Sequence, residues 1–194
     1  MKFTKIPSDA FQKSQINAGI LTTDFTPATG TIGEAGQIGA TTGGVNFTAT
    51  PTYSDFGEDI DNCPKNMKEL KRLDSWEAKM TGTFINADTK IAKSLCGAAD
   101  VGTSDGKVTP RNDLADADFA DIWLVGDYSD KNGDKNGGFI AIHLMNALST
   151  GGFQLQTSDK AKGQFTFEYT AHYSMAAQDT VPFEIYIKAG TAEG

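Results

Sequence analysis

The chain contains little cysteine and little histidine, and it has fewer basic than acidic residues. Its 194 residues include two cysteines and two histidines, and 17 Lys and Arg stand against 25 Asp and Glu, a formal net charge of −8. Cys63 and Cys96 have no CxxC or Cys/His spacing around them, so we expect neither a metal nor a redox site there. The acidic balance disfavours a protein that grips nucleic acid by neutralising phosphates.

Long hydrophobic runs are also missing. No stretch approaches the roughly 20 apolar residues of a membrane-spanning helix, and residues 1–7 lack the apolar run of a secretory signal. We therefore expect no membrane contact and a protein made and kept in a cytoplasm, where a structural disulfide is disfavoured. The length favours a single domain over residues 1–194 with a core of its own.

Apolar and polar residues alternate strictly along several segments, as in strands with one buried and one hydrated face. The clearest runs are 76–84, 164–173 and 183–188. Two further apolar runs, 120–126 and 139–145, flank a polar stretch and predict a hairpin with a long loop. The predicted fold class is therefore mainly β.

One segment has helical spacing. In residues 88–99, Ile91 and Leu95 fall on one face, Asp88 is placed as an N-cap and Gly97 lies near the end. We therefore predict one α-helix. Residues 65–73 fit either a helix or an extension of the adjoining strand, and the sequence does not decide between them.

Glycine is concentrated near the N-terminus. Residues 26–44 contain six glycines with Thr and Ala between them and almost no bulky side chain. Such a stretch contributes little core by itself. We therefore predict a flexible N-terminal, glycine-rich arm over about residues 1–44 and an extended loop over about residues 51–66, each either flexible or ordered by a neighbouring subunit.

Motifs that carry chemistry are weak. Residues 130–136 resemble the start of a calcium loop, but Lys135 stands where that loop has Gly and Ala141 where it has Glu, so we favour a solvated hairpin tip. The glycines open no phosphate-binding helix, and His143 and His172 have no nucleophile motif nearby. We expect no catalytic residues, no metal and no cofactor, and an enzyme is the least favoured class.

Charge is clustered along the chain. One acidic block is followed directly by a basic one, and a second acidic block comes later; in order they are Asp55, Glu58, Asp59 and Asp61, then Lys65, Lys68, Lys71 and Arg72, then Asp113, Asp116, Asp118 and Asp121. Opposite charges of this kind favour head-to-tail contacts between copies of one chain. Solvated charge that contacts nothing explains the pattern equally well.

The segments 39–50, 55–66, 110–114 and 118–123 resemble the major tail (tail tube) proteins of long, non-contractile-tailed phages and prophages of Gram-positive bacteria. The resemblance runs over nearly the whole chain. It implies two antiparallel sheets packed as a sandwich or barrel, the tail-tube fold, with one flanking α-helix and no active site. Tubes of contractile tails and of type VI secretion systems share this architecture.

The resemblance also implies a function and partners. Six copies would close into a ring, and stacked rings would form a virion tail tube, assembled in the host cytoplasm, that conducts double-stranded DNA without holding it. A tape-measure protein, a tail terminator and distal tail proteins would be its other partners. The first two charged blocks, from Asp55 to Arg72, become candidate ring-stacking residues. The alternative is a monomeric β-sandwich carbohydrate-binding module.

Overall fold

The computed structural model describes residues 5–131 and 137–191. It is mainly β, as the alternation predicts, with one α-helix among the described residues. The strands are β1 (Ile20–Thr22), β2 (Phe25–Thr26), β3 (Thr31–Ile32), β4 (Gln37–Gly39), β5 (Thr41–Asp55), β6 (Lys71–Phe84), β7 (Ala99–Val101), β8 (Val108–Pro110), β9 (Ala120–Tyr128), β10 (Gly138–Ser149), β11 (Gln154–Gln156), β12 (Gln164–Thr170) and β13 (Phe183–Lys188). The helices are α1 (Thr89–Cys96) and the 3₁₀ turns η1 (Phe11–Lys13), η2 (Glu34–Gly36), η3 (Lys68–Leu70) and η4 (Asp116–Asp118).

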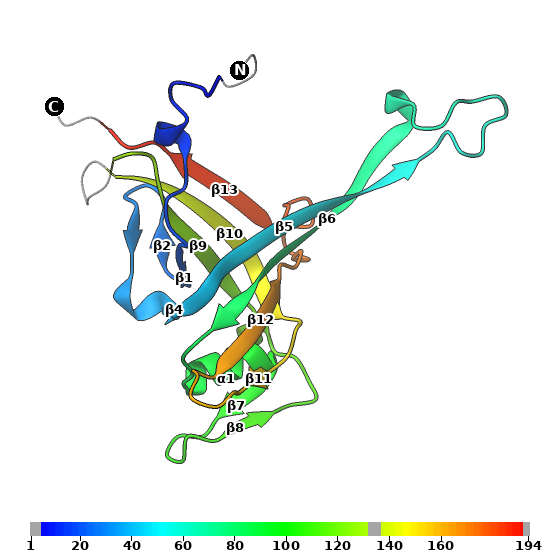
Figure 1. The fold of residues 1–194 in the computed structure, drawn as a ribbon. Helices are drawn as coiled ribbons and strands as arrows, with labels where there is room; N and C mark the ends of the chain where they lie inside the picture. The colour runs from blue at the N-terminus through cyan, green and yellow to red at the C-terminus, as the bar shows by residue number, and fades with distance from the viewer. Residues whose placement is uncertain (1–4, 132–136, 192–194) are drawn as a thin grey trace.

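One large antiparallel sheet folds into two packed halves (Figure 1). One half contains β4, β1, β9, β10 and β13, and the other contains β5, β6, β12 and β11. Strand β10 joins them, because its end pairs Leu148 with Thr170 of β12. Its register shifts between Leu144 and Ala147, where Asn146 has a φ of 47°. This irregularity bends the strand and lets it change partners.

The main core lies between the two halves and beneath α1. Its largest buried side chains are Leu21, Met80, Phe84, Ile91, Leu95, Leu144, Phe167 and Tyr169. The hydroxyl of Tyr169 is hydrogen-bonded to Ser94 Oγ of α1 at 2.8 Å. Burial raises the pKa of Tyr169, because the ionised phenol would lose its hydration. The hydroxyl of Ser149 on β10 also donates to the carbonyl of Leu95 at 2.9 Å, so the helix is joined to the sheet by packing and by two polar contacts.

A smaller core covers the other face of the β9–β10 half. Phe25, Trp123, Val125 and Ala141 are buried there, beneath the short β2–β3 hairpin. The rings of Phe25 and Trp123 lie 5.4 Å apart, and Phe25 meets Phe139 edge-on at 5.2 Å. Strand β9 is therefore buried on both faces of the sheet, which explains why it has apolar residues at consecutive positions.

Helix α1 begins and ends as the sequence predicts. Asp88 is the N-cap, and its Oδ1 accepts a hydrogen bond of 2.7 Å from the backbone N–H of Ile91. Gly97 ends the helix with a φ of 76°, a conformation that favours glycine. The apolar side chains of Ile91 and Leu95 are turned into the core.

Removal of this cap tests how far α1 depends on it. We expect Asp88→Ala to lower the free energy of unfolding by about 1 kcal/mol, because the N–H of Ile91 loses its acceptor. Asp88→Asn keeps a side-chain oxygen acceptor and should retain most of the stability. Denaturant unfolding followed by circular dichroism measures both, and equal losses in the two variants would contradict the role of the cap.

The glycine-rich segment differs from the flexible arm predicted over about residues 1–44. From Ile20 onward it forms β1 to β4 and the start of β5 within one subunit. A Cβ on Gly39 would lie 3.0 Å from Ile91 Cδ1 and 3.1 Å from Phe84 Cδ1, so this glycine lets the backbone approach the core closely. Before β1, the N–H of Ile16 donates to the carbonyl of Asp127, which holds the segment against the end of β9.

The structure also decides between the two predictions for residues 65–73 and identifies the predicted hairpin. Residues 65–73 contain η3 and the start of β6, and the long-looped hairpin is β9–β10. Most of the calcium-like segment 130–136 lies outside the described residues. Within the described residues, no helix combines the length and the apolar character needed to cross a membrane.

Candidate assembly surface

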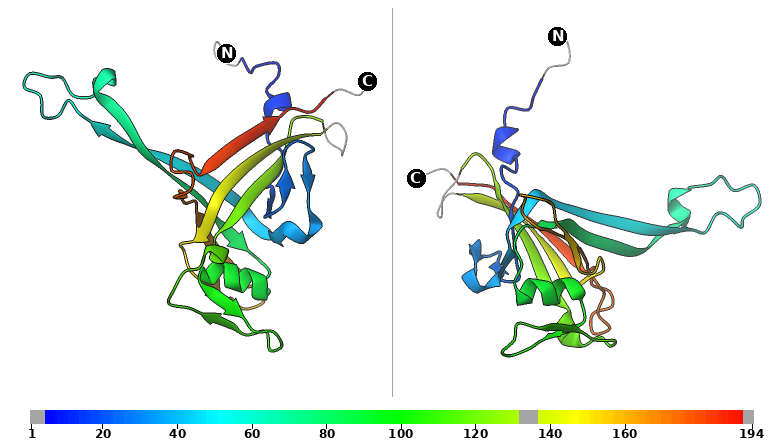
Figure 2. Two further views of the ribbon diagram at one scale, coloured as in Figure 1. Left: turned by 180° about the vertical axis from the view of Figure 1, so that it is seen from behind. Right: turned by 60° about the horizontal axis from the view of Figure 1, so that its bottom comes forward.

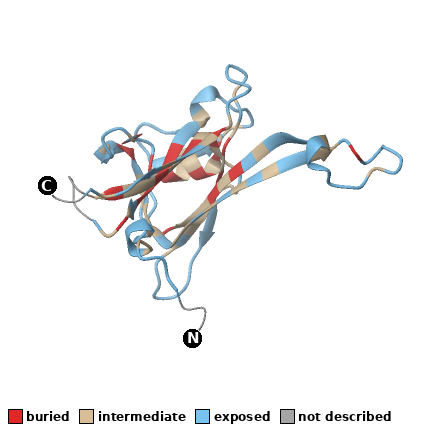
Figure 3. Cartoon of the chain, turned by 90° about the horizontal axis from the view of Figure 1, so that it is seen from above, coloured by how far each residue is buried: buried red, intermediate tan, exposed pale blue. Residues whose placement is uncertain are grey.

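The β5–β6 hairpin extends far beyond the body of the protein (Figures 1 and 2). We call its distal part, residues 51–76, the extension. Pairing begins there with Pro51 opposite Trp76 and continues to Asp55 opposite Lys71. Most of the extension is exposed (Figure 3). A two-stranded ribbon without a covering layer gains little stability by itself, so contacts within the single chain do not explain the length of the extension.

One side of the extension is apolar. The facing pairs Pro51–Trp76 and Tyr53–Leu73 continue the row that starts in the core, and we call these four residues the extension row. A bulge leaves Asp74 unpaired between them, so that Leu73 instead of Asp74 falls opposite Tyr53. Tyr53 is 54% exposed and Leu73 is 44% exposed. The bulge thus keeps an apolar row facing solvent.

The unpaired Asp74 of the bulge is bound by two other side chains of the extension. Its carboxylate accepts hydrogen bonds from the hydroxyl of Ser54 and from Nε of Arg72, the latter at 2.9 Å. These two donors, Ser54 first, hold the pKa of Asp74 below its usual range. Arg72 also lies over the ring of Phe56, with its Cζ 5.2 Å from the centroid. The guanidinium is therefore already occupied within the chain.

The loop at the tip is closed by one carboxylate. Asp55 accepts hydrogen bonds of 3.0 Å from the backbone N–H groups of Gly57 and Asn66, and both lower the pKa of its carboxyl. The N–H of Phe56 donates to the carbonyl of Leu70. Asn66 has a φ of 63°, in the left-handed region that asparagine tolerates. Asp55 therefore shapes the loop.

The structure brings all eight predicted stacking residues onto the extension. Asp55 and Arg72 are engaged as described, and Lys71 lies with its Nζ 5.7 Å from the ring centroid of Tyr53. Lys68 forms a 3.4 Å ion pair with the neighbouring Glu69. The remaining four are exposed and form no ion pair within the described part of the chain: Glu58, Asp59, Asp61 and Lys65.

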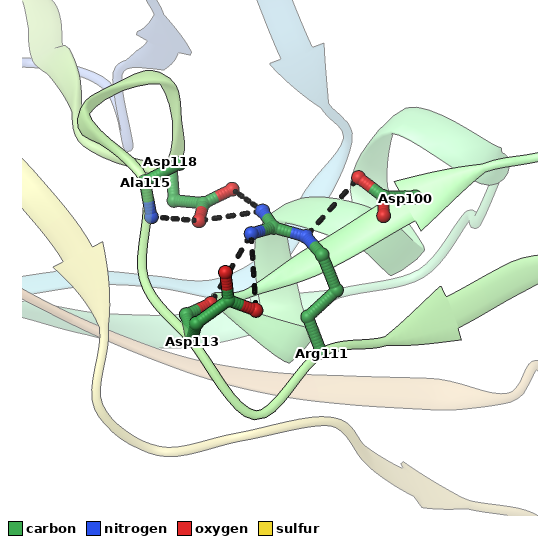
Figure 4. Close-up of polar contacts among 5 residues, drawn as sticks. All are labelled: Asp100, Arg111, Asp113, Ala115 and Asp118. Carbon is green, nitrogen blue, oxygen red and sulfur yellow. Dashed lines mark hydrogen bonds and ion pairs between the residues drawn. The ribbon is translucent and has the colours of Figure 1, made fainter.

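The second acidic block is largely used inside the subunit (Figure 4). Both carboxylate oxygens of Asp118 accept from Nη2 of Arg111 at 2.7 Å, and the Asp118 side chain is 1% exposed. Asp121 accepts from the backbone N–H of Asn146. Asp113, Asp116 and Asp121 are exposed, but Asp113 also lies 3.8 Å from Nη1 of Arg111 and Asp121 lies 3.2 Å from Nε2 of His143.

Sequence reasoning did not find the apolar side chains of the extension. The exposed members are Tyr53, Phe56, Ile60, Met67 and Leu73. The alternation at residues 51–55 was the available signal, but it could be attributed equally to a buried strand. A single sequence does not show that the covering layer is missing.

Other site types find less support in the described residues. No group of three or more His, Cys, Asp or Glu there could hold a metal ion. The exposed aromatic side chains are divided among the N-terminal segment, the extension and the loops beside β11 and β12: Phe11, Tyr53, Phe56, Phe153 and Tyr173. This division does not supply the single aromatic face on which a sugar chain stacks.

No family model matches the chain, and no curated protein matches it.

Proposed function

We propose that the chain is a structural subunit of a phage-type tail tube. Six copies close into a ring, rings stack, and double-stranded DNA passes through the channel. The observation that carries this proposal is the extension: a long ribbon that projects from a complete β body with an apolar row and a charged tip exposed (Figure 1). The resemblance to tail tube proteins supports the same function.

The energetics favour burial of the extension against another subunit. Full burial of a large apolar side chain is worth about 1.5–3 kcal/mol. Five such side chains of the extension remain 40–55% exposed in the single chain. Covering them would release several kcal/mol in each copy, which is enough to contribute substantially to a repeated interface. A heterologous contact of this type propagates into rings or filaments.

The outward face of the β5–β6–β12 half is consistent with a channel wall. It carries mainly threonine, at Thr42, Thr48, Thr50, Thr81, Thr83, Thr166 and Thr170. The Lys79 ammonium on this face lies 2.6 Å from Glu77 and 3.9 Å from Glu168, and these acids raise the pKa of Lys79, Glu77 most. The two carboxylates offset the positive charge of Lys79, so this face attracts a passing phosphate less strongly.

Negative-stain electron microscopy of the purified protein tests the proposal directly. We expect rings, or tubes of stacked rings, with an open channel wide enough for a DNA duplex. Size-exclusion chromatography with light scattering measures the oligomeric state of the same sample. A protein that stays monomeric at all concentrations and binds glycans would overturn the proposal in favour of a carbohydrate-binding module.

Charge reversal at the tip tests ring stacking. We expect Lys65→Glu and Lys68→Glu together to lower tube yield at low salt by about tenfold, because repulsion replaces attraction between stacked copies and neither lysine is held by Asp74 or by the extension row. Tube length and yield are measured from micrographs and by sedimentation.

A matched control makes the same charge change elsewhere. Lys160 and Lys162 are exposed and lie outside the extension, so their reversal to Glu should leave assembly close to that of the wild type. Tubes of normal length and yield in the tip variant at low salt would rule out electrostatic stacking through these residues.

A further inference from the structure

A second apolar row on β13 and β10 is only partly covered: Ile142 packs against the main core, whereas Ile185 and Ile187 of β13 are exposed. Ile185 lies opposite Ile142, and Ile187 lies opposite Ile140, so the four side chains form two facing pairs on one side of the sheet. We call them the isoleucine row. Ile185 is 51% exposed and Ile187 is 60% exposed, although this side of β13 carries Phe183 into the main core. Contiguous apolar surface of this kind marks an interaction site.

The isoleucine row and the extension row start from the same contact. Phe183 packs against Phe47 and Trp76, with ring centroids 5.7 Å and 5.5 Å apart. From this point β13 runs one way along the body and the β5–β6 hairpin runs another, so the two rows diverge (Figures 1 and 2). The extension of a chain therefore does not cover the isoleucine row of that chain.

We propose that the isoleucine row is the docking site for the extension row of a neighbouring copy. This inference rests on the tail-tube function proposed above and assigns the two surfaces of one of its contacts. Every copy carries both rows, so each copy donates an extension and accepts one, which gives a heterologous contact. The contact would repeat between copies the aromatic and aliphatic packing that Phe183 makes with Trp76 within the chain.

The chemistry of the two rows separates this contact from the charged tip. The isoleucine row contains no charged residue, and Glu184 and Lys188 alternate onto the opposite face of β13. Lys71 lies beside Tyr53 on the extension with its aliphatic stem available for packing. Assembly through the rows should therefore persist at high salt, whereas stacking through the tip should weaken.

Paired variants test the contact. Ile185→Thr with Ile187→Thr alters the acceptor, Tyr53→Thr with Leu73→Thr alters the extension, and threonine keeps the β propensity of both strands. Each double variant should fold with nearly unchanged circular dichroism and should lose tube yield at least tenfold. Val101→Thr with Leu114→Thr is the matched control, because both side chains are exposed and apolar but lie outside both rows. The control should assemble normally.

Cross-linking identifies the surfaces themselves. Cys63→Ser and Cys96→Ser first remove the native thiols. Chains with Leu73→Cys are then mixed with differently tagged chains with Ile185→Cys and treated with a short cross-linker that carries two thiol-reactive groups. Mixed dimers containing one chain of each tag are expected, and replacing Ile185→Cys by Leu114→Cys should abolish them.

The outcomes separate this inference from the proposed function. If the wild type forms tubes, two results would overturn the row contact and leave the tail-tube function standing. One is that the acceptor and extension variants form tubes equally well, and the other is that no mixed dimers form. A wild type that forms no ring or tube under any condition would overturn the function itself.

Discussion

Replacing residues 53–74 by an Asn-Gly turn is expected to leave a folded body that no longer assembles. Thr52 and Ser75 face each other in the hairpin, and two residues suffice to connect directly paired positions through a type I′ turn. The deleted segment holds none of the main core, which lies beneath α1 and between the sheet halves. The Tm of the body should therefore change by no more than about 5 °C.

The loss of assembly should be large, because the deletion removes several apolar side chains and the charged tip at once. We expect tube formation to fall by about 100-fold or more, as follows from the loss of a few kcal/mol per contact. The full-length variant with Tyr53→Phe and Leu73→Met keeps an apolar row of similar volume and serves as the control. Rings and tubes of the truncated chain with normal yield would show that the extension is not required.

Local patterns predict several of the long strands and the helix. Alternation along 164–173 and 183–188 predicts β12, which ends at Thr170, and β13, because the period of two is a property of the strand itself. The N-cap at Asp88 and the spacing of Ile91 and Leu95 identify α1 in the same way. Each of these signals is contained within one short segment, so no knowledge of neighbours was needed.

Features that depend on which strands pair were harder to predict from the sequence. The sequence predicts an extended loop over about residues 51–66, but residues 51–55 continue β5 because β6 provides a facing strand as far as Lys71. The composition of the glycine-rich segment predicts an arm, but the segment forms strands of the body, and Gly39 lies where a Cβ would crowd Ile91 and Phe84. A residue type tolerated in loops can also be demanded by packing, and a single sequence does not distinguish the two.

The same distinction between local patterns and strand pairing applies to the candidate assembly surface. The sequence places the eight charged residues on one surface because they are near one another in the chain, and the hairpin keeps them together in space. The extension row depends on the bulge at Asp74, and the isoleucine row depends on the register of β10 with β13. A shift of one residue would turn either row to the other face, and the alternation alone does not set that register.

The ion-pair cluster around Arg111 is expected to contribute strongly to the stability of the body. Its guanidinium contacts three carboxylates: Asp118 through Nη2 at 2.7 Å, Asp100 through Nε at 3.1 Å and Asp113 through Nη1 at 3.8 Å (Figure 4). Asp118 also accepts from the backbone N–H of Ala115 at 2.9 Å. The cluster therefore fixes the segment that leads from β8 into the central strand β9.

We expect Arg111→Met to lower Tm by about 10 °C at neutral pH, because it leaves the buried carboxylate of Asp118 without its cation. Arg111→Lys should recover only part of the loss, since an ammonium does not bind both oxygens as a planar fork does. The double variant Arg111→Met with Asp118→Asn removes the unpaired charge and should be more stable than Arg111→Met alone. Additive losses in a double-mutant cycle would contradict a direct coupling.

The pH dependence of this cluster has a definite sign. The N–H of Ala115, followed by the Arg111 guanidinium, lowers the pKa of Asp118 in the folded protein. A carboxyl of this kind stabilises the fold above its unfolded pKa of about 3.9, and the contribution is lost as pH falls through the folded pKa. The difference in Tm between wild type and Arg111→Met should therefore be constant from pH 7 to about 5 and should shrink below about 3.9. A difference that stays unchanged down to pH 2 would show that Arg111 stabilises the loop by packing and not through the charge of Asp118.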